Sequence, residues 1–220
     1  AASDVYKRQG SRCDTESHIY CYTFSKEIYK NWKWKERYPK QKEILNYLKY
    51  VEKKLKLRKN IIFNNRVISA NYLENKKLWS LKTNKKRSFY CRYLISAVGS
   101  LSAANIPNIK GIKSFKGDWY QSGRWPNKKI TFKNQKVAQI GTGSTGIQIA
   151  PVLAKSAKSL TIFQRTPNYS IPARNRKLTK SFQENTKKNY LKIKNLLTKT
   201  PGGHGFHFAK KSIFEFNETK

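Results

Sequence analysis

The sequence has few acidic residues, cysteines and histidines, and it lacks methionine altogether. Its 12 Asp and Glu residues face 47 Lys and Arg residues, which gives a formal net charge of +35 at pH 7. The lysines are spread over nearly every segment and form no single block, and no nucleic-acid-binding motif accompanies them. We therefore predict no nucleic-acid partner, although the excess of positive charge should attract anionic ligands.

The three cysteines are odd in number and fall at no metal-ligand spacing. They argue against a disulfide framework and indicate a reducing, cytoplasmic location. The three histidines are too scattered to predict a metal site. No apolar run approaches the roughly 20 residues that cross a bilayer, so no membrane span is predicted. Because no initiator methionine is present, we interpret the sequence as an internal fragment and residues 1–9 as a non-native leader.

The most informative segment is a glycine-rich loop between two predicted strands. Val137 to Ile140 is a short apolar run, typical of a buried strand, and it leads into Gly141, Gly143 and Gly146, spaced as GxGxxG. Gly141 permits a tight turn, Gly143 lets a pyrophosphate approach the backbone, and Gly146 lets the following helix pack on the strand. The start of that helix presents unpaired N–H groups to phosphates. The sequence therefore predicts a dinucleotide-binding unit.

The second predicted strand, residues 160–164, ends at Arg165, where an NAD-binding protein usually places an acidic residue for the ribose 2'-hydroxyl. No acidic residue lies between Gly141 and Gln183. A guanidinium can bind a 2'-phosphate through two parallel hydrogen bonds, so we predict that the loop prefers NADP. Further coenzyme contacts are expected from five nearby polar side chains, Thr142, Ser144, Thr145, Gln148 and Thr166. The Ser and Thr residues among them could also be loop and helix-cap residues.

Upstream of this unit, the pattern predicts one helix and a small antiparallel meander. Apolar residues recur at helical spacing over residues 41–57, with charged residues on the other face. Strands are expected at residues 61–63 and 66–72 (a pair or one bulged strand), at 78–82 and at 89–98.

The remaining segments are predicted to be a linker and one helix. Glycine and proline punctuate the chain between Gly99 and Val137, which predicts an irregular connection between two domains. Beyond Pro172 the chain becomes strongly polar, and residues 178–198 are predicted to form a single helix. The weak apolar face of that helix is expected to need a partner outside this sequence.

The strings RCDTES, WKWKERYPKQKEILNYL, FKGDWYQSGRWP, GTGSTGIQ and FQRTPNYSIPARN resemble, in order and spacing, segments of the Baeyer-Villiger monooxygenases. These are FAD- and NADPH-dependent flavoproteins. The resemblance covers residues 10–208 and implies an α/β fold, with a Rossmann-like NADP-binding domain and part of a FAD-binding domain that contains the small antiparallel meander. The implied boundaries are 10–100 for a partial FAD-binding domain without its first glycine loop, 101–134 for the linker and 135–220 for a truncated NADP-binding domain with the start of a helical insertion.

The family carries a fingerprint of the form FxGxxxHxxxWP before its second glycine loop. Phe115, Gly117, Trp125 and Pro126 match it, whereas Gln121 stands where the family has histidine. That histidine is linked in the family to productive coupling of NADPH to oxygenation, and a glutamine cannot take up a proton near neutral pH. The resemblance thus places Gln121 at a catalytic position. A purely structural role of the segment, with its aromatic residues packed between domains, stays equally open.

The same comparison implies a set of residues near FAD. Asp14 matches an acidic residue beside the flavin that orients the family's catalytic arginine, and Tyr20 lies in the adjoining flavin-side segment. Val67 would lie near the adenine, and Gly99 in the string AVG occupies the place of a turn near FAD. The resemblance therefore implies FAD as the second cofactor.

The implied reaction inserts one oxygen atom of O2 into a small-molecule ketone through a C4a-peroxyflavin and yields an ester or lactone. The family's first glycine loop and its catalytic arginine have no counterpart in this sequence, so the fragment alone is expected to be inactive. Three alternatives stay open: a related flavin monooxygenase that oxidises nitrogen or sulfur centres, a basic nucleic-acid-binding module, and an uncoupled reductase. The sequence names neither the ketone nor the oligomeric state.

Overall fold

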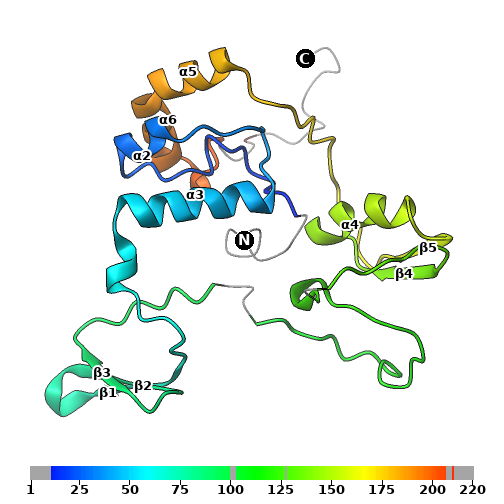
Figure 1. Cartoon of the computed structure of the whole chain (residues 1–220), viewed down its shortest axis with the longest axis horizontal. Coiled ribbons are helices and arrows are strands. Elements are labelled where there is room, and N and C mark those ends of the chain that lie inside the picture. Colours follow the sequence, from blue (N-terminus) through cyan, green and yellow to red (C-terminus); the bar gives the residue numbers. More distant parts are fainter. Residues whose placement is uncertain (1–10, 100–102, 127, 207–209, 211–220) are drawn as a thin grey trace.

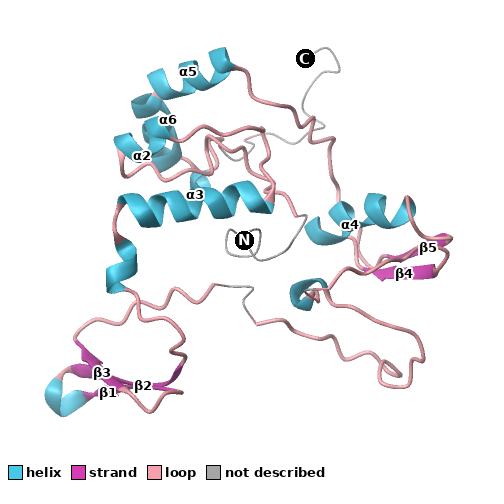
Figure 2. Cartoon of the chain, viewed as in Figure 1, coloured by secondary structure: helices cyan, strands magenta, loops and turns pink. Residues whose placement is uncertain are grey.

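The computed structural model describes residues 11–99, 103–126, 128–206 and 210, and the predicted leader, residues 1–9, lies outside these ranges. The elements form three groups (Figure 1). Helices from the first and last parts of the chain lie together, and the strands occupy two separate places (Figure 2). Within the described ranges, no helix combines the length and the apolar character that a membrane crossing requires.

The main hydrophobic core lies in an N-terminal helical module, residues 11–54. Helix α2, Lys26–Asn31, begins at Ser25, whose side chain accepts a hydrogen bond from the Ile28 N–H. Helix α3, Gln41–Lys54, confirms the predicted amphipathic helix but ends three residues early. Its buried face packs into one cluster with residues from α2 and the preceding loop, namely Cys13, Ile28, Trp34, Ile44, Tyr47 and Val51.

The predicted antiparallel meander is present, with two corrections to its extent. Strands β1, Val67–Leu73, β2, Leu78–Thr83, and β3, Ser88–Cys91, pair in that order. Residues 61–63 form no strand, and residues 92–98 do not extend β3 as predicted. The pairing of β3 ends where Cys91 lies opposite Trp79, because the described residues provide no further strand beside it. Side chains beyond that point are left exposed.

The glycine-rich segment forms the predicted β–α–β unit, but its first strand is not buried as predicted, since Ile140 is 70% exposed. Strand β4, Lys136–Ile140, and strand β5, Ser159–Phe163, pair in parallel, and helix α4, Ser144–Ala154, connects them. A parallel pair requires such a crossover, since a two-residue turn cannot return the chain to the same edge. Residues 103–126 and 128–134, predicted as a linker, contain only one 3-10 turn, Ser122–Arg124, as helical structure.

The predicted single helix at residues 178–198 is two helices, α5, Lys180–Lys188, and α6, Tyr190–Lys199. They meet at Asn189, whose Nδ2 donates to the Asn185 carbonyl oxygen at 2.9 Å. The expectation that their apolar face lacks a partner in this sequence is wrong, because the face packs on the N-terminal helical module. The Tyr190 hydroxyl donates to the Thr23 carbonyl oxygen at 2.6 Å, and its ring lies 5.1 Å from that of Tyr29.

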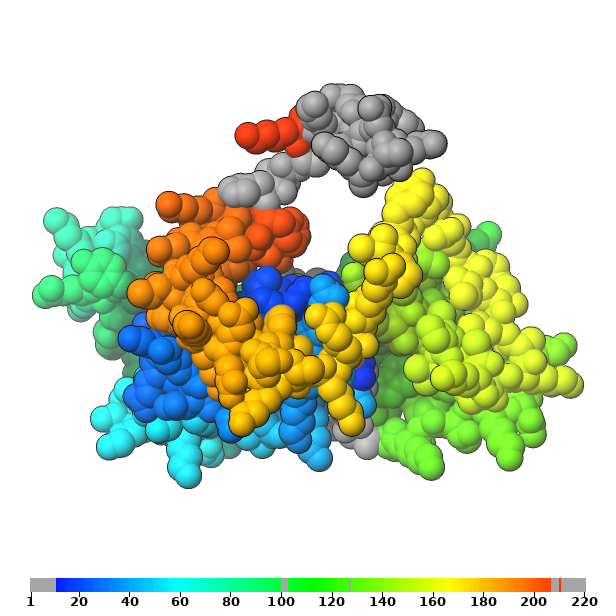
Figure 3. All heavy atoms as spheres, turned by 90° about the horizontal axis from the view of Figure 1, so that it is seen from above, coloured from blue at the N-terminus to red at the C-terminus, as the bar shows by residue number. Residues whose placement is uncertain are grey.

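A polar junction joins the segment after β5 to the N-terminal helical module. Arg12 forms an ion pair with Glu36 and donates to the Tyr38 carbonyl oxygen at 2.9 Å. Asn175 donates to Glu36 Oε2 at 2.9 Å and accepts from the Tyr38 N–H at 2.9 Å. Figure 3 shows the segment after β5 (yellow) leading from the β–α–β unit to α5 and α6 (orange).

The carboxylate of Glu36 is stabilised in its charged form at this junction. Burial raises its pKa, but the hydrogen bonds from Arg12 and Asn175 and the Arg12 charge outweigh burial, so the pKa lies below its ordinary value. Because a protonated Glu36 would lose the ion pair, the junction depends on a pH above the acidic range.

We expect Ile44→Ala to lower the free energy of unfolding of this chain by about 2–5 kcal/mol, because Ile44 is 1% exposed and its loss leaves a cavity in the core. Urea denaturation followed by circular dichroism measures the change. Ile68→Ala is the matched control, since Ile68 is 63% exposed, and it should cost less than about 1 kcal/mol. Equal losses for the two variants would contradict this account of the core.

We expect Glu36→Gln to destabilise the chain by about 1 kcal/mol at pH 7 and by less at pH 3. A carboxyl group whose folded pKa is depressed stabilises the fold above its unfolded pKa, and that contribution disappears as the pH falls through the folded pKa. Urea denaturation of both proteins at the two pH values measures the difference. Glu184→Gln is the control, because Glu184 is 65% exposed and its nearest lysine nitrogen is 3.9 Å away. A pH-independent difference for Glu36→Gln would refute the role of its charge.

Candidate functional site

The turn after β4 has the geometry that the glycine spacing predicts. Gly141 has φ +98°, which L side chains rarely adopt, and its N–H donates to the Phe163 carbonyl oxygen of β5 at 2.9 Å. A Cβ atom at Gly146 would clash with the Gly141 carbonyl oxygen, whereas the space beside Gly143 is open. The turn is therefore closed on the helix side and open where a phosphate would approach.

The first turn of α4 can bind an anion with backbone groups. The helix begins after Gly143, which has no side chain to cap the first N–H groups, and its first turn contains no acidic residue. Ser144 is exposed at the helix start, and Thr145 is half-buried next to it. Uncapped N–H groups and the positive end of the helix dipole suit this position to a pyrophosphate.

The loop after β5 folds back onto the glycine turn. Gln164 Nε2 donates to the Thr142 hydroxyl at 2.8 Å, and Asn168 Nδ2 donates to the Thr142 carbonyl oxygen at 3.0 Å. Arg165 and Thr166 lie between these two contacts along the chain, and both are exposed. The arrangement keeps the guanidinium-bearing loop against the turn and leaves Arg165 accessible to a ligand.

Sequence reasoning missed three residues that shape the turn. Two of them are Gln164 and Asn168, whose only sequence signal is their place at the end of β5. The third is Gln139 of β4, whose Nε2 donates to the carbonyl oxygens of Gly141 at 3.0 Å and of Gly146 at 3.1 Å. The sequence gives little sign of this role, because a glutamine near the end of a strand does not by itself predict a side-chain contact with the following turn.

Gln148 lies one turn into α4 but its amide is engaged with the chain itself. Gln148 Oε1 accepts from the Arg12 N–H at 2.9 Å, and Nε2 donates to the Arg12 carbonyl oxygen at 3.2 Å. The structure therefore brings the segment that carries Asp14 to the helix of the glycine turn. Asp14 itself is exposed, two residues beyond Arg12.

The two flavin-side residues predicted near the N-terminus differ in environment. Tyr20 is half-buried and packs against the core of the N-terminal helical module, whereas Asp14 is exposed. Next to Asp14, burial raises the pKa of the Cys13 thiol, so the thiol is neutral at physiological pH. A neutral Cys13 adds no charge beside the Asp14 carboxylate.

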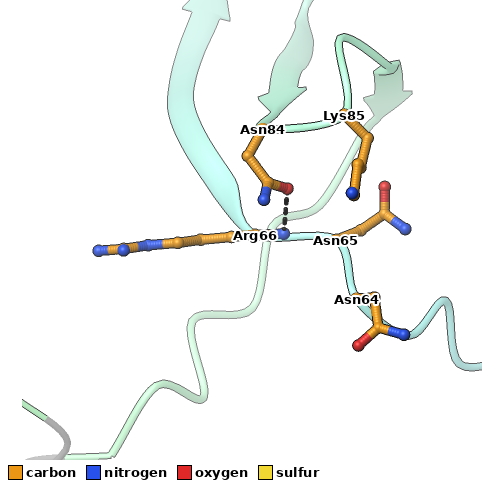
Figure 4. A pocket seen from close by; sticks show the side chains of 5 residues that line it. All are labelled: Asn64, Asn65, Arg66, Asn84 and Lys85. Atoms are coloured by element: carbon orange, nitrogen blue, oxygen red, sulfur yellow. Dashed lines mark hydrogen bonds between the residues drawn. The ribbon is translucent and has the colours of Figure 1, made fainter.

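The residues predicted near the adenine and the FAD turn lie on exposed chain. Val67, the first residue of β1, is 52% exposed, and Gly99 has φ +81°. A polar hollow of about 590 Å³ adjoins Val67 and is lined by Asn64, Asn65, Arg66, Asn84 and Lys85. In Figure 4 the Arg66 N–H donates to the Asn84 side chain, which holds the two loops of the hollow together.

Gln121 is fixed within the linker. Its Nε2 donates to the Asn105 carbonyl oxygen at 2.7 Å, whereas its Oε1 is buried without a hydrogen-bond partner in the described parts of the chain. The nearby rings of Tyr120, Trp125 and Phe132 pack on one another at centroid distances of 5.8–6.3 Å. The fingerprint segment thus has its own small aromatic cluster.

In the described parts of the chain, no three His, Cys, Asp or Glu side chains lie together in a group that could hold a metal ion.

Comparisons with known proteins agree with this geometry. Residues 16–199 match the pyridine nucleotide-disulphide oxidoreductase family. The chain is 42% identical over 181 residues to cyclohexanone 1,2-monooxygenase of an Acinetobacter species, which covers 82% of this chain and 33% of that protein. It is 39% identical over 197 residues to a Baeyer-Villiger monooxygenase of Pseudooceanicola batsensis, which covers 90% of this chain and 36% of that protein.

Among solved structures, the chain resembles an oxidised steroid monooxygenase bound to NADP, with a TM-score of 0.85 and 39% identity. The match covers 97% of this chain and 42% of that one, so this chain spans about a third to two fifths of the length of the proteins that it matches. The family match extends over most of the chain and includes the glycine turn. The chain belongs to the pyridine nucleotide-disulphide oxidoreductase family and corresponds to part of a flavoprotein of the Baeyer-Villiger monooxygenase type.

Proposed function

We propose that this chain is part of an enzyme that uses NADPH, FAD and O2 to insert one oxygen atom into a small ketone, which yields an ester or lactone. One observation carries the proposal: the glycine turn opens at an uncapped helix start, with the Arg165 loop hydrogen-bonded across it. Two relatives support the same reaction class: the cyclohexanone 1,2-monooxygenase, whose name specifies a ketone, and the Baeyer-Villiger monooxygenase of Pseudooceanicola batsensis.

The residues of the turn fit a phosphate-bearing nicotinamide coenzyme. The N–H groups at the start of α4 would bind the pyrophosphate, and the open space beside Gly143 would let it approach the backbone. Arg165 would bind the 2'-phosphate through its planar guanidinium. Thr142 is already engaged with Gln164 and Asn168, so its part is to hold the Arg165 loop in place.

Fewer features of the structure support the binding of FAD. Asp14 and Gly99 are exposed, Gly99 has a positive φ, and the polar hollow beside Val67 offers amide groups for an adenosine. A bound flavin supplies the redox chemistry, because it accepts a hydride and then reacts with dioxygen. The chain's own residues would hold the two cofactors, orient Asp14 beside the flavin and exclude water.

A second candidate is oxidation of a nitrogen or sulfur centre by a related flavin monooxygenase. Gln121 favours it, because an amide stands where the Baeyer-Villiger fingerprint has histidine. In that reading Gln121 takes no part in proton transfer, and its amide acts as a hydrogen-bond donor to the Asn105 carbonyl oxygen.

We expect Arg165→Ala in the full-length protein to weaken NADPH binding by about 10–100-fold and to change NADH binding less than twofold. The loss corresponds to hydrogen bonds between two charged groups, and NADH lacks the phosphate that they hold. Isothermal titration calorimetry with both coenzymes measures the effect. Arg87→Ala, in the turn before β3, is the control for net charge and should leave both affinities unchanged. Equal affinity of the unmutated protein for NADPH and NADH would refute the assignment of Arg165.

We expect Gln121→His in the full-length protein to lower the hydrogen peroxide released per NADPH consumed, because an imidazole can exchange a proton near neutral pH and an amide cannot. A peroxidase-coupled assay with a ketone substrate measures the release. Gln121→Asn is the matched control, since its side chain is also an amide, and it should not reduce the release. If Gln121→His leaves coupling unchanged, the residue does not limit oxygenation.

A further inference from the structure

Two hydrogen bonds connect parts of the chain that are 136 residues apart. Gln148 Oε1 accepts from the Arg12 N–H at 2.9 Å, and Gln148 Nε2 donates to the Arg12 carbonyl oxygen at 3.2 Å. We call this pair of bonds the clasp. It pairs the side-chain amide of Gln148 with both the N–H and the carbonyl oxygen of Arg12, so it fixes the position and the orientation of the Arg12 backbone on α4.

The Arg12 backbone is held firmly on its other side. Its side chain forms the ion pair with Glu36 and reaches the Tyr38 carbonyl oxygen, and the next residue, Cys13, donates its N–H to the Pro39 carbonyl oxygen at 3.1 Å. The clasp therefore joins this well-held segment to α4. A small displacement of α4 must either move residues 12–14 with it or break the clasp.

The two ends of the clasp lie close to the two halves of the proposed site. Gln148 is one turn from the N–H groups at the start of α4, and a helix transmits displacement along its axis because its backbone hydrogen bonds make it stiff. Arg12 is two residues from Asp14, which the proposed function puts beside the flavin. The clasp thus lies between the proposed coenzyme site at the start of α4 and the segment that carries Asp14.

We propose that Gln148 is a positioning residue, which links NADP binding at the glycine turn to the placement of residues 12–14. This inference rests on the proposed function, because it takes the turn to be the coenzyme site. It differs from the sequence-based expectation that Gln148 contacts the coenzyme, since both polar atoms of its side chain are engaged with Arg12. Coenzyme bound at the start of α4 stabilises the closed clasp, and the closed clasp strengthens coenzyme binding.

Linkage makes the proposal quantitative. If the Arg12 N–H exchanges with solvent only when the clasp is open, the factor by which NADP+ slows exchange equals the factor by which loss of the clasp weakens NADP+ binding. We expect both factors to be about fivefold, which is at the lower end of coupling between sites in proteins. A residue that touches the coenzyme directly would change affinity without this equality.

The test compares the full-length flavoprotein with Gln148→Leu, which keeps a helix-forming side chain of similar size but cannot form the clasp. Hydrogen–deuterium exchange of the peptide that contains the Arg12 N–H is measured with and without NADP+, and calorimetry gives the NADP+ affinity. Val152→Ala is the matched control on the same helix, since Val152 is 66% exposed. Gln148→Glu keeps the acceptor but loses the donor, so it should fall between the unmutated protein and Gln148→Leu.

The expected result is that NADP+ slows Arg12 exchange in the unmutated protein and in Val152→Ala, but not in Gln148→Leu, whose affinity falls by the same factor. A larger loss of affinity with NADP+-dependent protection retained would overturn the proposal and make Gln148 a direct ligand. If the unmutated protein does not bind NADP+, the proposed function fails. The clasp is then judged without coenzyme: faster Arg12 exchange in Gln148→Leu supports it as a positioning contact, and unchanged exchange refutes it.

Discussion

The close approach of Gly146 to the Gly141 carbonyl oxygen is the contact on which the site depends. A side chain at position 146 would push α4 away from β4, and the helix could then not begin directly at the turn. Because it does begin there, the start of α4 adjoins the open space beside Gly143, where backbone N–H groups and the helix dipole would act on the same anion in the proposed site. The other features of the turn, including the amide of Gln139, maintain this geometry.

The positive charge of the chain favours the same kind of ligand as the glycine turn, namely an anion. No carboxylate lies between Gly141 and Gln183, so nothing in that stretch opposes a ligand with several phosphates. The wide distribution of lysine gives long-range attraction that salt screens, whereas in the proposed function Arg165 would supply a local and directional contact. Only the local contact can discriminate between coenzymes that differ by one phosphate, because a diffuse field acts on both.

The Glu36 junction and the clasp both join the β–α–β unit and the segment that follows it to the N-terminal helical module. The Glu36 junction holds the segment after β5, and the clasp holds α4 itself. Both contacts include Arg12, the first through its side chain and the second through its backbone. A single well-fixed residue thus lies between the residues that resemble the coenzyme site and those that resemble the flavin side, and this arrangement gives Asp14 a defined place relative to the glycine turn.

The sequence by itself determined the elements whose signal is local: the face of α3, the pairing of β1 with β2 across a short turn, and the glycine spacing between β4 and α4. The tertiary structure decided what depends on neighbours. Residues 92–98 are apolar enough for a strand but have none beside them in the described chain, and the predicted helix at 178–198 breaks at Asn189, where two helices follow the surface of the N-terminal helical module. The contacts of Gln164 and Gln148 also needed coordinates, because an amide pairs equally well with any peptide group, and only the folded chain selects which one it meets.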